Sequence, residues 1–476
     1  MDTKIIKNKE LNIWEALIPV CFLMILLAYN IFFADGELFG TYSNQIILLL
    51  SGGVSLIMGL FNKVKVRSMI DEIWINIKSI FVPIIILLLV GALAGTWLIS
   101  GIIPAMIYYG LQVLSPSIFL PASVIIASII SIATGSSWTT SATVGIALIG
   151  IGTTLGIPAG MIAGAVISGA YFGDKMSPLS DTTNLAPAMA GTDLFTHIKY
   201  MAYTTVPTYI VTLIVFSILS LTIQTNGTAN INSILETIKN TFVITPYLFL
   251  VPILVIVLIV FKTKPLIALT SGVVSAIVFA LYFQPELINS LGASKFKTIL
   301  NAIFTETSII TNNTSLNDLF SSKGMGGMLW TILLILSAMV FGGIMDAIGA
   351  LSRITAVLLS FASSVFGLFA TTVISCLGLN IVASDQYLAL VIPGKMFKKA
   401  FEEKGLAPEN LSRTLEDSGT VTSVLIPWNT CGAYQSSVLG VDVGDYFIYA
   451  IFNWLSPITT LIFAAFNIKI RQLIKK

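Results

Sequence analysis

The stretch GAYFGDKMSPLSDTTNLAP, residues 169–187, is the most informative part of this chain, because it places two aspartates, a lysine and two prolines among apolar residues. A charge at the centre of a membrane helix costs about 2.5 to 3.5 kcal/mol on insertion scales. Asp174 and Asp181 therefore predict a functional site with a partner to be found. A second stretch of similar character, RTLEDSGTVTSVLIPWNTCGAY, occupies residues 413–434.

The composition around these stretches is that of a protein that crosses a membrane many times. Of 476 residues, 56% are hydrophobic and only 10% are charged, and the mean hydropathy is +0.93. Runs of about 20 apolar residues, enough to cross about 30 Å of hydrocarbon, recur along the chain. The clearest are residues 17–33, 46–61, 80–99, 247–261, 329–348 and 446–466. We predict an all-α polytopic membrane protein.

Basic residues in the loops predict the orientation. Three lysines precede the first apolar run, and Lys63, Lys65 and Arg67 follow the second, while the loop between the two runs is acidic. Because cytoplasmic loops carry the excess of Lys and Arg, we predict a cytoplasmic N-terminus, and the basic tail KIRQLIKK predicts the same for the C-terminus. The net charge of +2 is too small to indicate a nucleic-acid partner.

The order of segments is repeated along the chain. Each half has two apolar runs, a loop, a glycine-interrupted run, a small-residue polar segment, a carboxylate-and-proline segment and a closing run. The loop after the second run is basic in the first half, whereas its counterpart, residues 284–323, falls on the outside. We therefore predict two inverted-topology repeats, residues 1–223 and 246–476, joined by an extracytoplasmic linker at residues 224–245.

Such repeats, with discontinuous helices that hold the substrate near the midplane, are the architecture of secondary transporters, and we predict about 12–14 membrane segments. The number depends on whether residues 117–150 and 371–393 each form a re-entrant hairpin followed by a helix. A channel is less favoured than a carrier, because the inversion implies alternating access.

Interrupted segments of the first half supply oxygen atoms. Residues 133–141, ATGSSWTTS, hold hydroxyls and predicted free carbonyls, which hard cations such as sodium prefer. The alternative is close helix packing by small residues. Asp174 beside Lys175 is a candidate neutralised pair at a helix end. Asp181 is followed by Thr182, Thr183 and Asn184 and has the character of an ion ligand.

The second half has its own polar set. Residues 380–387, NIVASDQY, contain Ser384 and Asp385, and residues 413–434 contain Asp417, which parallels Asp174 or Asp181. Glu416 points to a different face if the segment is helical, and so belongs either to the site or to the membrane interface. We predict Asp181 and Asp417 as the sodium ligands. The only histidine, His197, lies in a short amphipathic connection, where a surface position is favoured.

Oxygen-rich broken helices combined with carboxylates suit a carrier in which sodium and protons compete for the same acids. Removing a carboxylate from water favours its protonated form, so a proton can occupy the site when sodium is absent. The same site also suits a small anion, because the N-terminal ends of half-helices carry positive partial charge.

Four stretches resemble the hallmark stretches of the NhaC family of sodium/proton antiporters: GSSWTTSATVGIALIGIG, ISGAYFGDKMSPLSDTTNLAP, ASDQYLALVIPG and residues 413–434. The likeness covers nearly the whole chain. It implies a bacterial inner-membrane carrier, commonly a homodimer, with re-entrant hairpins and a transport domain that moves beside a scaffold domain. Its partners would be membrane lipid, sodium and protons, with no cofactor. One branch of the family resembles malate/lactate exchangers, which leaves a small carboxylic acid as an alternative substrate.

The resemblance also carries over individual polar positions. These are Ser136, Ser137, Trp138, Asp174, Ser177, Asp181, Thr182, Asn184, Ser384, Asp385, Glu416, Asp417, Thr420, Asn429 and Thr430.

An intramembrane aspartyl protease is a remote alternative from a different functional class. Such an enzyme uses paired aspartates on facing helices as catalytic acid and base. Asp174 follows Tyr171, Phe172 and Gly173 rather than the GxG of those enzymes, and no earlier run has a matching Tyr-Asp pair. We therefore do not predict an enzyme.

Overall fold

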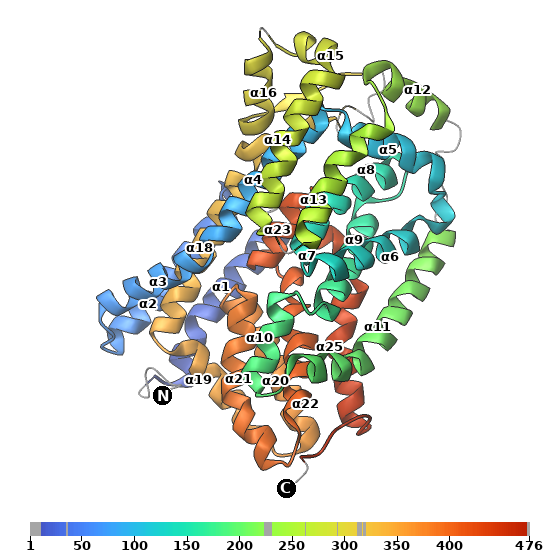
Figure 1. The fold of residues 1–476 in the computed structure, drawn as a ribbon. Helices are drawn as coiled ribbons and strands as arrows, with labels where there is room; N and C mark the ends of the chain where they lie inside the picture. The colour runs from blue at the N-terminus through green and yellow to red at the C-terminus, as the bar shows by residue number, and fades with distance from the viewer. Residues whose placement is uncertain are drawn as a thin grey trace.

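The computed structural model describes residues 11–34, 37–222, 231–261, 263–292, 294–311, 317 and 320–473. Nearly all of these residues are helical, and long helices pack side by side with shorter ones between them (Figure 1). In the described ranges eight helices are long and apolar enough to cross a membrane, and a pair bent by 84° at residues 232–260 would make a ninth span. The prediction of an all-α polytopic membrane protein is confirmed.

The eight long apolar helices are α1 (Ile13–Phe33), α2 (Ser43–Phe61), α4 (Phe81–Ile99), α6 (Pro116–Thr134), α11 (Leu194–Thr222), α14 (Pro265–Phe283), α18 (Gly324–Ala347) and α20 (Val365–Val382). The shorter helices are α3 (Val66–Ser79), α5 (Ile102–Val113), α7 (Ser137–Thr140), α8 (Ile146–Thr154), α9 (Ala159–Met176), α10 (Asp181–Ala190), α12 (Ile231–Thr241), α13 (Leu250–Val260), α15 (Pro285–Ser290), α16 (Lys295–Phe304), α19 (Ala350–Ser360), α21 (Gln386–Glu403), α22 (Pro408–Leu415), α23 (Thr430–Leu439), α24 (Val443–Tyr446) and α25 (Ile451–Ala465).

Turns of other helical types interrupt this pattern. Two are π-helical, η1 (Ser141–Gly145) and η4 (Glu416–Thr420), and two are 3₁₀ turns, η3 (Pro246–Phe249) and η5 (Ser423–Leu425). In the described ranges the strands are β1 (Leu38–Thr41) and the antiparallel pair of β2 (Thr307–Ser308) with β3 (Ser321–Ser322), and Leu406 and Gln472 form an isolated β-bridge. The predicted loop at residues 284–323 thus contains α15, α16 and a small hairpin, and the predicted linker contains α12.

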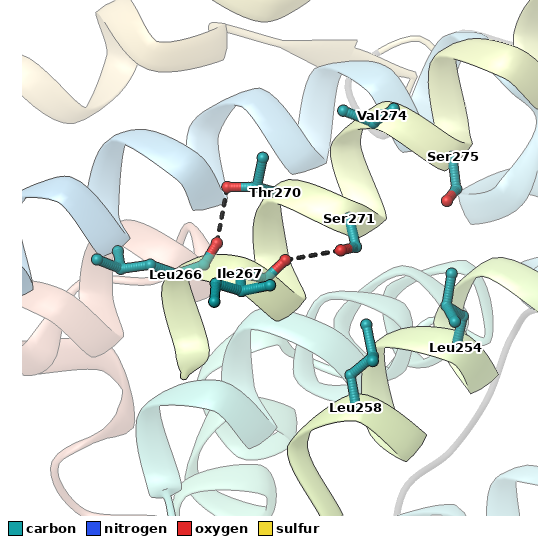
Figure 2. Close-up of a pocket in the computed structure, with 8 residues that line it drawn as sticks. All are labelled: Leu254, Leu258, Leu266, Ile267, Thr270, Ser271, Val274 and Ser275. Carbon is teal, nitrogen blue, oxygen red and sulfur yellow. Dashed lines mark hydrogen bonds between the residues drawn. The ribbon is translucent and has the colours of Figure 1, made fainter. Parts of the chain in front are cut away.

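Hydroxyl side chains on the apolar helices donate hydrogen bonds to backbone carbonyls of their own helix. Figure 2 shows a largely apolar groove between α13 and α14, in which Thr270 donates to the carbonyl of Leu266 at 2.7 Å and Ser271 donates to that of Ile267 at 2.8 Å. These bonds to the residue four positions earlier remove the need for water, so the hydroxyls are tolerated beside hydrocarbon. The groove lacks charged residues and lies apart from the polar sites described below.

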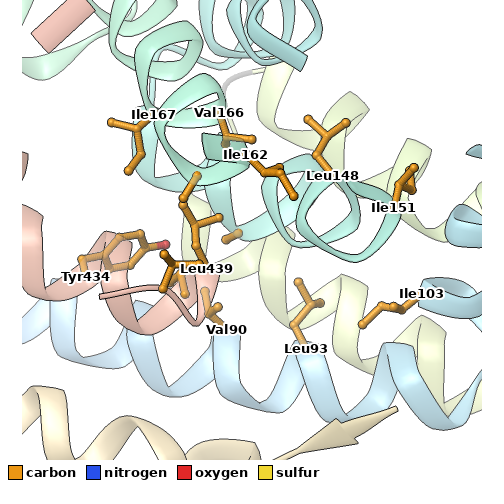
Figure 3. Packing of buried hydrophobic residues seen from close by; sticks show 14 of the residues in the cluster. Val90, Leu93, Ile103, Leu148, Ile151, Ile162, Val166, Ile167, Tyr434 and Leu439 are labelled. Atoms are coloured by element: carbon orange, nitrogen blue, oxygen red, sulfur yellow. The ribbon is translucent and has the colours of Figure 1, made fainter. Parts of the chain in front are cut away.

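The main apolar core joins the first and second halves of the chain. Val90 and Leu93 of α4 face Ile162 and Val166 of α9 and Leu439 of α23, with side chains of α5 and α8 completing the layer (Figure 3). Because these residues come from opposite ends of the sequence, their burial requires the two halves to fold together.

Glycines bring α6 and α9 into backbone contact. A Cβ atom added at Gly169 would lie 2.2 Å from the carbonyl oxygen of Val124, and one at Gly173 would lie 2.5 Å from that of Ser128. Small residues let membrane helices approach this closely. In lipid the hydrophobic effect does not drive helices together, so the dispersion energy of this close contact is what stabilises the pair.

Four helices are broken inside the molecule and restart at a side-chain cap. α7, α10, α21 and α23 begin after Ser136, Ser180, Asp385 and Asn429, and each of these side chains accepts a hydrogen bond from a backbone N–H in the first turn. Such caps satisfy N–H groups that lack a partner within the helix. The predicted discontinuous helices are therefore present; the predicted number of membrane segments stays a prediction, because several segments are shorter than a full span.

We expect Gly169→Ala to destabilise the protein by about 1–3 kcal/mol, because the added methyl group overpacks the contact between α6 and α9. Thermal unfolding of the purified protein in detergent measures this as a lower Tm. Gly378→Ala is the matched control. Gly378 lies on α20, and a Cβ atom added there would have no other atom within 4 Å. Equal Tm values for the two variants would contradict the packing argument.

Candidate functional site

The centre of the polar interior is an ion pair between Lys175 and Asp417, whose side chains are both fully buried. Lys175 lies in the last turn of α9, and Asp417 lies in the π-turn η4 that follows α22. The sequence suggested that Lys175 pairs with its neighbour Asp174, but the structure pairs Lys175 with Asp417 instead. Consecutive residues on a helix point about 100° apart, so Lys175 faces η4 while Asp174 faces another segment.

Three hydroxyl groups surround this ion pair. Thr204 of α11 donates to Asp417 Oδ2 at 2.8 Å, and Thr460 of α25 donates to the same oxygen. Ser456 of α25 lies 3.1 Å from Lys175 Nζ and 3.3 Å from Asp417 Oδ1. A buried pair is stable only when further hydrogen bonds replace the water that both charges have lost. The arrangement therefore ties α9, η4, α11 and α25 together at one point.

Asp174 connects the end of α9 to the restart at α7. Its Oδ2 accepts hydrogen bonds from the backbone N–H of Ser137 at 3.1 Å and from the Ser137 hydroxyl at 2.7 Å. The Thr183 hydroxyl lies 3.2 Å and 3.1 Å from the carbonyl oxygens of Asp174 and Lys175, which closes the C-terminal end of α9 against α10. Asp174 and Ser137, both predicted for the site, are thus in direct contact.

Asp181 occupies a different environment from Asp417. It is the first residue of α10 and is exposed, as is Asn184, whose amide donates to the carbonyl of Pro178 at 3.0 Å. The exposed Tyr387 of α21 is close enough to Asp181, Asp174 and Asp385 to interact electrostatically with all three. In the described part of the chain Asp181 is not among the groups that contact Asp417, so the two predicted sodium ligands do not form one coordination sphere.

A second network joins the breaks of the second half. Asn429 donates through Nδ2 to the carbonyl of Asn380 at 3.0 Å, and Asn380 donates to the carbonyl of Gly419 at 2.7 Å. The backbone N–H of Thr430 donates to the carbonyl of Ser384 at 3.0 Å, and Ser384 has a positive φ of 58°. α20, η4 and α23 therefore meet at the predicted residues Ser384, Asn429 and Thr430.

The remaining predicted residues hold helix ends in place. Ser177 donates to the carbonyl of Ile132 at 2.8 Å, and the hydroxyls of Thr182 and Ser180 are 3.2 Å apart. Trp138 stacks on Tyr434 with ring centroids 3.9 Å apart, which joins α7 to α23.

Glu416 is fully buried inside the protein, so of the two alternatives left open for it the structure favours the polar interior over an exposed position. By distance and angle neither of its carboxyl oxygens is hydrogen-bonded to another described residue, although the Thr420 hydroxyl is near enough to interact with it. The Ser384 hydroxyl also has no hydrogen-bond partner among these residues. Glu416 interacts electrostatically with Lys175, Asp174 and Asp417.

The charges of this interior do not balance. The buried acids include Asp174, Asp385, Glu416 and Asp417, and the buried bases near them are Lys175 and Arg413. With every one of these groups ionised, the region would carry an excess negative charge. An uncompensated charge in a medium of low dielectric is costly, so the region favours an additional cation, whether a proton or a metal ion.

Several residues of this interior were not predicted as site residues from the sequence. Thr204, Ser456 and Thr460 stand in apolar runs without a recognisable motif, whereas Lys175 and Asn380 lie inside stretches that we singled out but were not named as site residues. His197 was expected at the surface but is fully buried, with Nδ1 2.8 Å from the Ser412 hydroxyl. Thr204 follows His197 by seven positions, about two helical turns, which puts both on one buried face of α11.

The described residues contain no cluster of three or more His, Cys, Asp or Glu side chains able to hold a metal ion.

Comparison with known proteins gives consistent matches. Residues 169–468 match the family described as the Na⁺/H⁺ antiporter family. The chain is 40% identical over 401 residues to the Na⁺/H⁺ antiporter NhaC of Alkalihalophilus pseudofirmus, which covers 84% of each chain. It is 36% identical over 389 residues to NhaC of Bacillus subtilis, covering 81% of this chain and 84% of the relative. It is also 35% identical over 417 residues to a malate-2H⁺/Na⁺-lactate antiporter of Bacillus subtilis, covering 87% and 86%.

We expect Asp417→Asn to destabilise the protein by about 3–5 kcal/mol, because Lys175 would remain buried without a counter-charge. Lys175→Gln should also be destabilising, because Asp417 would then remain buried without a counter-charge. The double variant should lose less stability than the sum of the two single variants, with an interaction energy of about 0.5–3 kcal/mol. Thermal unfolding of the four proteins in sodium-free detergent solution measures this cycle. Additive losses would show that the pair does not couple the two residues.

Proposed function

This chain is an NhaC-type member of the Na⁺/H⁺ antiporter family and exchanges sodium for protons, and we propose that the buried groups around Asp417 bind both cations in turn. The observation that carries this proposal is the charge imbalance: the buried acids Asp174, Asp385, Glu416 and Asp417 outnumber the buried bases Lys175 and Arg413. In this proposal the carboxylate of Asp417 takes either a proton or a sodium ion, but not both together. That competition couples the two fluxes.

The oxygen atoms at Asp417 fit sodium as a substrate. Its carboxylate and the hydroxyls of Thr204, Thr460 and Ser456 are the hard oxygen ligands that sodium prefers. The Lys175 ammonium now occupies the position beside Asp417 Oδ1. Sodium would take its place, and the freed ammonium would then lie close to Glu416. In this proposal Asp417 is a direct ligand, whereas the exposed Asp181 is a ligand on the entry route, near Tyr387.

The other predicted residues have supporting roles in this proposal. Asp174 and Ser137 hold the broken ends of α9 and α7 together, and Asn429, Thr430 and Ser384 do the same for α23 and α20. Because both networks lie at helix breaks, a change at either would alter how the backbone surrounds the cation.

We propose that residues 1–223 and 246–476 form inverted repeats that permit alternating access. Support comes from the matched order of unusual backbone positions: a glycine with φ of 80° follows both α4 and α18, a residue with positive φ precedes the caps of α7 and α21, and a glycine ends both α10 and α23. The pairs are Gly101 and Gly349, Gly135 and Ser384, and Gly191 and Gly440. Positive φ is rare for residues other than glycine, so its recurrence at Ser384 is informative.

The protein is a multi-pass membrane protein, and we propose the bacterial inner membrane with both termini in the cytoplasm. The basic loops and tail support this orientation. The described chain also begins and ends at the same end of the molecule (Figure 1). A homodimer is proposed on the family resemblance alone.

An exchanger of small carboxylic acids is the second candidate. One relative, 35% identical, carries malate and lactate in its name, whereas the NhaC relatives at 36–40% identity are named only for sodium and protons. We therefore favour sodium/proton exchange. The aspartyl protease alternative finds no support in these relatives, which are named as antiporters.

We expect a sodium gradient to change the internal pH of liposomes that contain the protein, because each sodium ion exchanged displaces protons. An entrapped pH-sensitive dye reports this, with and without malate and lactate on opposite sides. A response that requires the organic acids would favour the second candidate, and no response under any combination would contradict both.

Asp417→Ala and Asp181→Ala should each reduce the sodium-driven pH change to that of empty liposomes, because each removes a carboxylate proposed to bind sodium. Asp193→Ala is the matched control: this aspartate is exposed and accepts a hydrogen bond from Thr196 N at 2.9 Å, away from the ion pair. Normal exchange in both test variants would show that sodium binds elsewhere.

A further inference from the structure

The groove between α13 and α14 has no part in the exchange described above. Leu254 and Leu258 line it from α13, and Ser271 and Val274 are among the residues that line it from α14 (Figure 2). Its volume of about 630 Å³ is in the range of about 300–1,000 Å³ that ligand sites commonly have. The hydroxyls of Thr270 and Ser271 already donate to backbone carbonyls of α14. The groove therefore suits a hydrocarbon chain, which packs by dispersion and needs no hydrogen bond.

The two ends of α14 have the side chains that mark membrane interfaces. Lys264 immediately precedes the helix and is exposed, and the exposed Tyr282 lies near the opposite end. Lysine and tyrosine side chains favour the layer where hydrocarbon meets water. The 18 positions from Lys264 to Tyr282 correspond to about 27 Å of helix, close to the hydrocarbon thickness of about 30 Å. We infer that α14 crosses the membrane with Lys264 at one headgroup layer.

The groove occupies the half of α14 that is next to Lys264. It runs from Leu266 to Ser275, about 14 Å along the helix, which is about half of the hydrocarbon thickness. One leaflet contributes that half, so an acyl chain in the groove would have its headgroup at the level of Lys264. Lys264, Ile267 and Ser271 follow helical spacing, which places the lysine above the face of α14 that lines the groove.

The charge at this end of the groove favours an anionic headgroup. Lys264 forms no ion pair with another residue of the described ranges. Residues 240–285, which include both helices of the groove, contain no Asp or Glu. The N-terminal end of α14 adds positive partial charge beside the lysine. A single basic residue at the membrane surface strengthens the binding of an anionic lipid by about fivefold.

We propose that the groove between α13 and α14 binds one acyl chain of an anionic phospholipid, whose phosphate lies at Lys264. In the proposed orientation this lipid belongs to the cytoplasmic leaflet, because the connection FKTK at residues 261–264 is basic. The groove is separate from the polar centre around Asp417 and is lined by other helices. The inference therefore does not depend on the proposed ion exchange.

Native mass spectrometry of the protein in mild detergent tests the chain-binding part. The probes are phosphatidylglycerol and phosphatidylcholine with the same acyl chains, added in equal amounts. We expect one tightly retained phospholipid per chain in the wild type. Ser271→Trp fills the groove and should lower the lipid-bound fraction by about fivefold or more. Ser217→Trp on α11 is the matched control and should bind as the wild type does, since Ser217 is also half-buried and donates to the carbonyl four positions earlier at 2.7 Å.

The same spectra test the headgroup part. The wild type should prefer phosphatidylglycerol by about fivefold, and Lys264→Gln should retain a phospholipid but bind the two kinds about equally. Lys297→Gln, which removes an exposed lysine of α16, should keep the preference. An unchanged preference in Lys264→Gln, or none in the wild type, would contradict a headgroup site at this lysine.

A wild type that retains no phospholipid, or equal retention in Ser271→Trp, would overturn the proposal. Val274→Trp gives the same comparison if Ser271→Trp does not purify as a folded protein. The competing occupant is a second copy of this chain. With Cys21 replaced by alanine, Ser271→Cys would then form a disulfide-linked dimer in the membrane, and that result would assign the groove to a protein contact instead of a lipid.

Discussion

The removal of charged side chains from water is the constraint on which the structure depends. Lys175 and Asp417 are fully buried, and their ion pair has to replace the hydration that both groups lost. The hydroxyls of Thr204, Ser456 and Thr460 complete the replacement, and they come from two helices distant in sequence. As a result α9, η4, α11 and α25 share one polar centre, which exists only when both halves of the chain are folded together.

Broken helices allow such a polar centre to be stable in an apolar surrounding. Each restart exposes backbone N–H groups, and a side chain at the break accepts from one of them, as Ser136, Ser180, Asp385 and Asn429 do. Asp174 and Asn380 then connect neighbouring breaks directly. Serine, asparagine and aspartate at these positions therefore stabilise the helix ends and also have a proposed role in ion binding. Their substitution should affect both stability and ion binding.

In the proposed function, the exchange of sodium for protons follows from a polar interior in which acids outnumber bases. Asp174, Asp385, Glu416 and Asp417 outnumber Lys175 and Arg413, so a bound proton or metal ion stabilises the region. By hydrogen-bond geometry the carboxyl oxygens of Glu416 are not bonded to another described residue. In the proposed function a proton and a sodium ion bind to this interior in turn.

Composition and local pattern were enough to predict the all-α membrane fold, the broken helices and the transporter class, because membrane burial demands long apolar runs and makes every internal charge conspicuous. The residues that begin the new helices, Ser136, Asp385 and Asn429, were likewise visible in their motifs. The partners of the charges were not. Lys175 pairs with a residue 242 positions later rather than with its neighbour. His197 is buried rather than at the surface. Side-chain direction and long-range contact depend on how helices pack in three dimensions, and helix packing leaves no local signature in the chain.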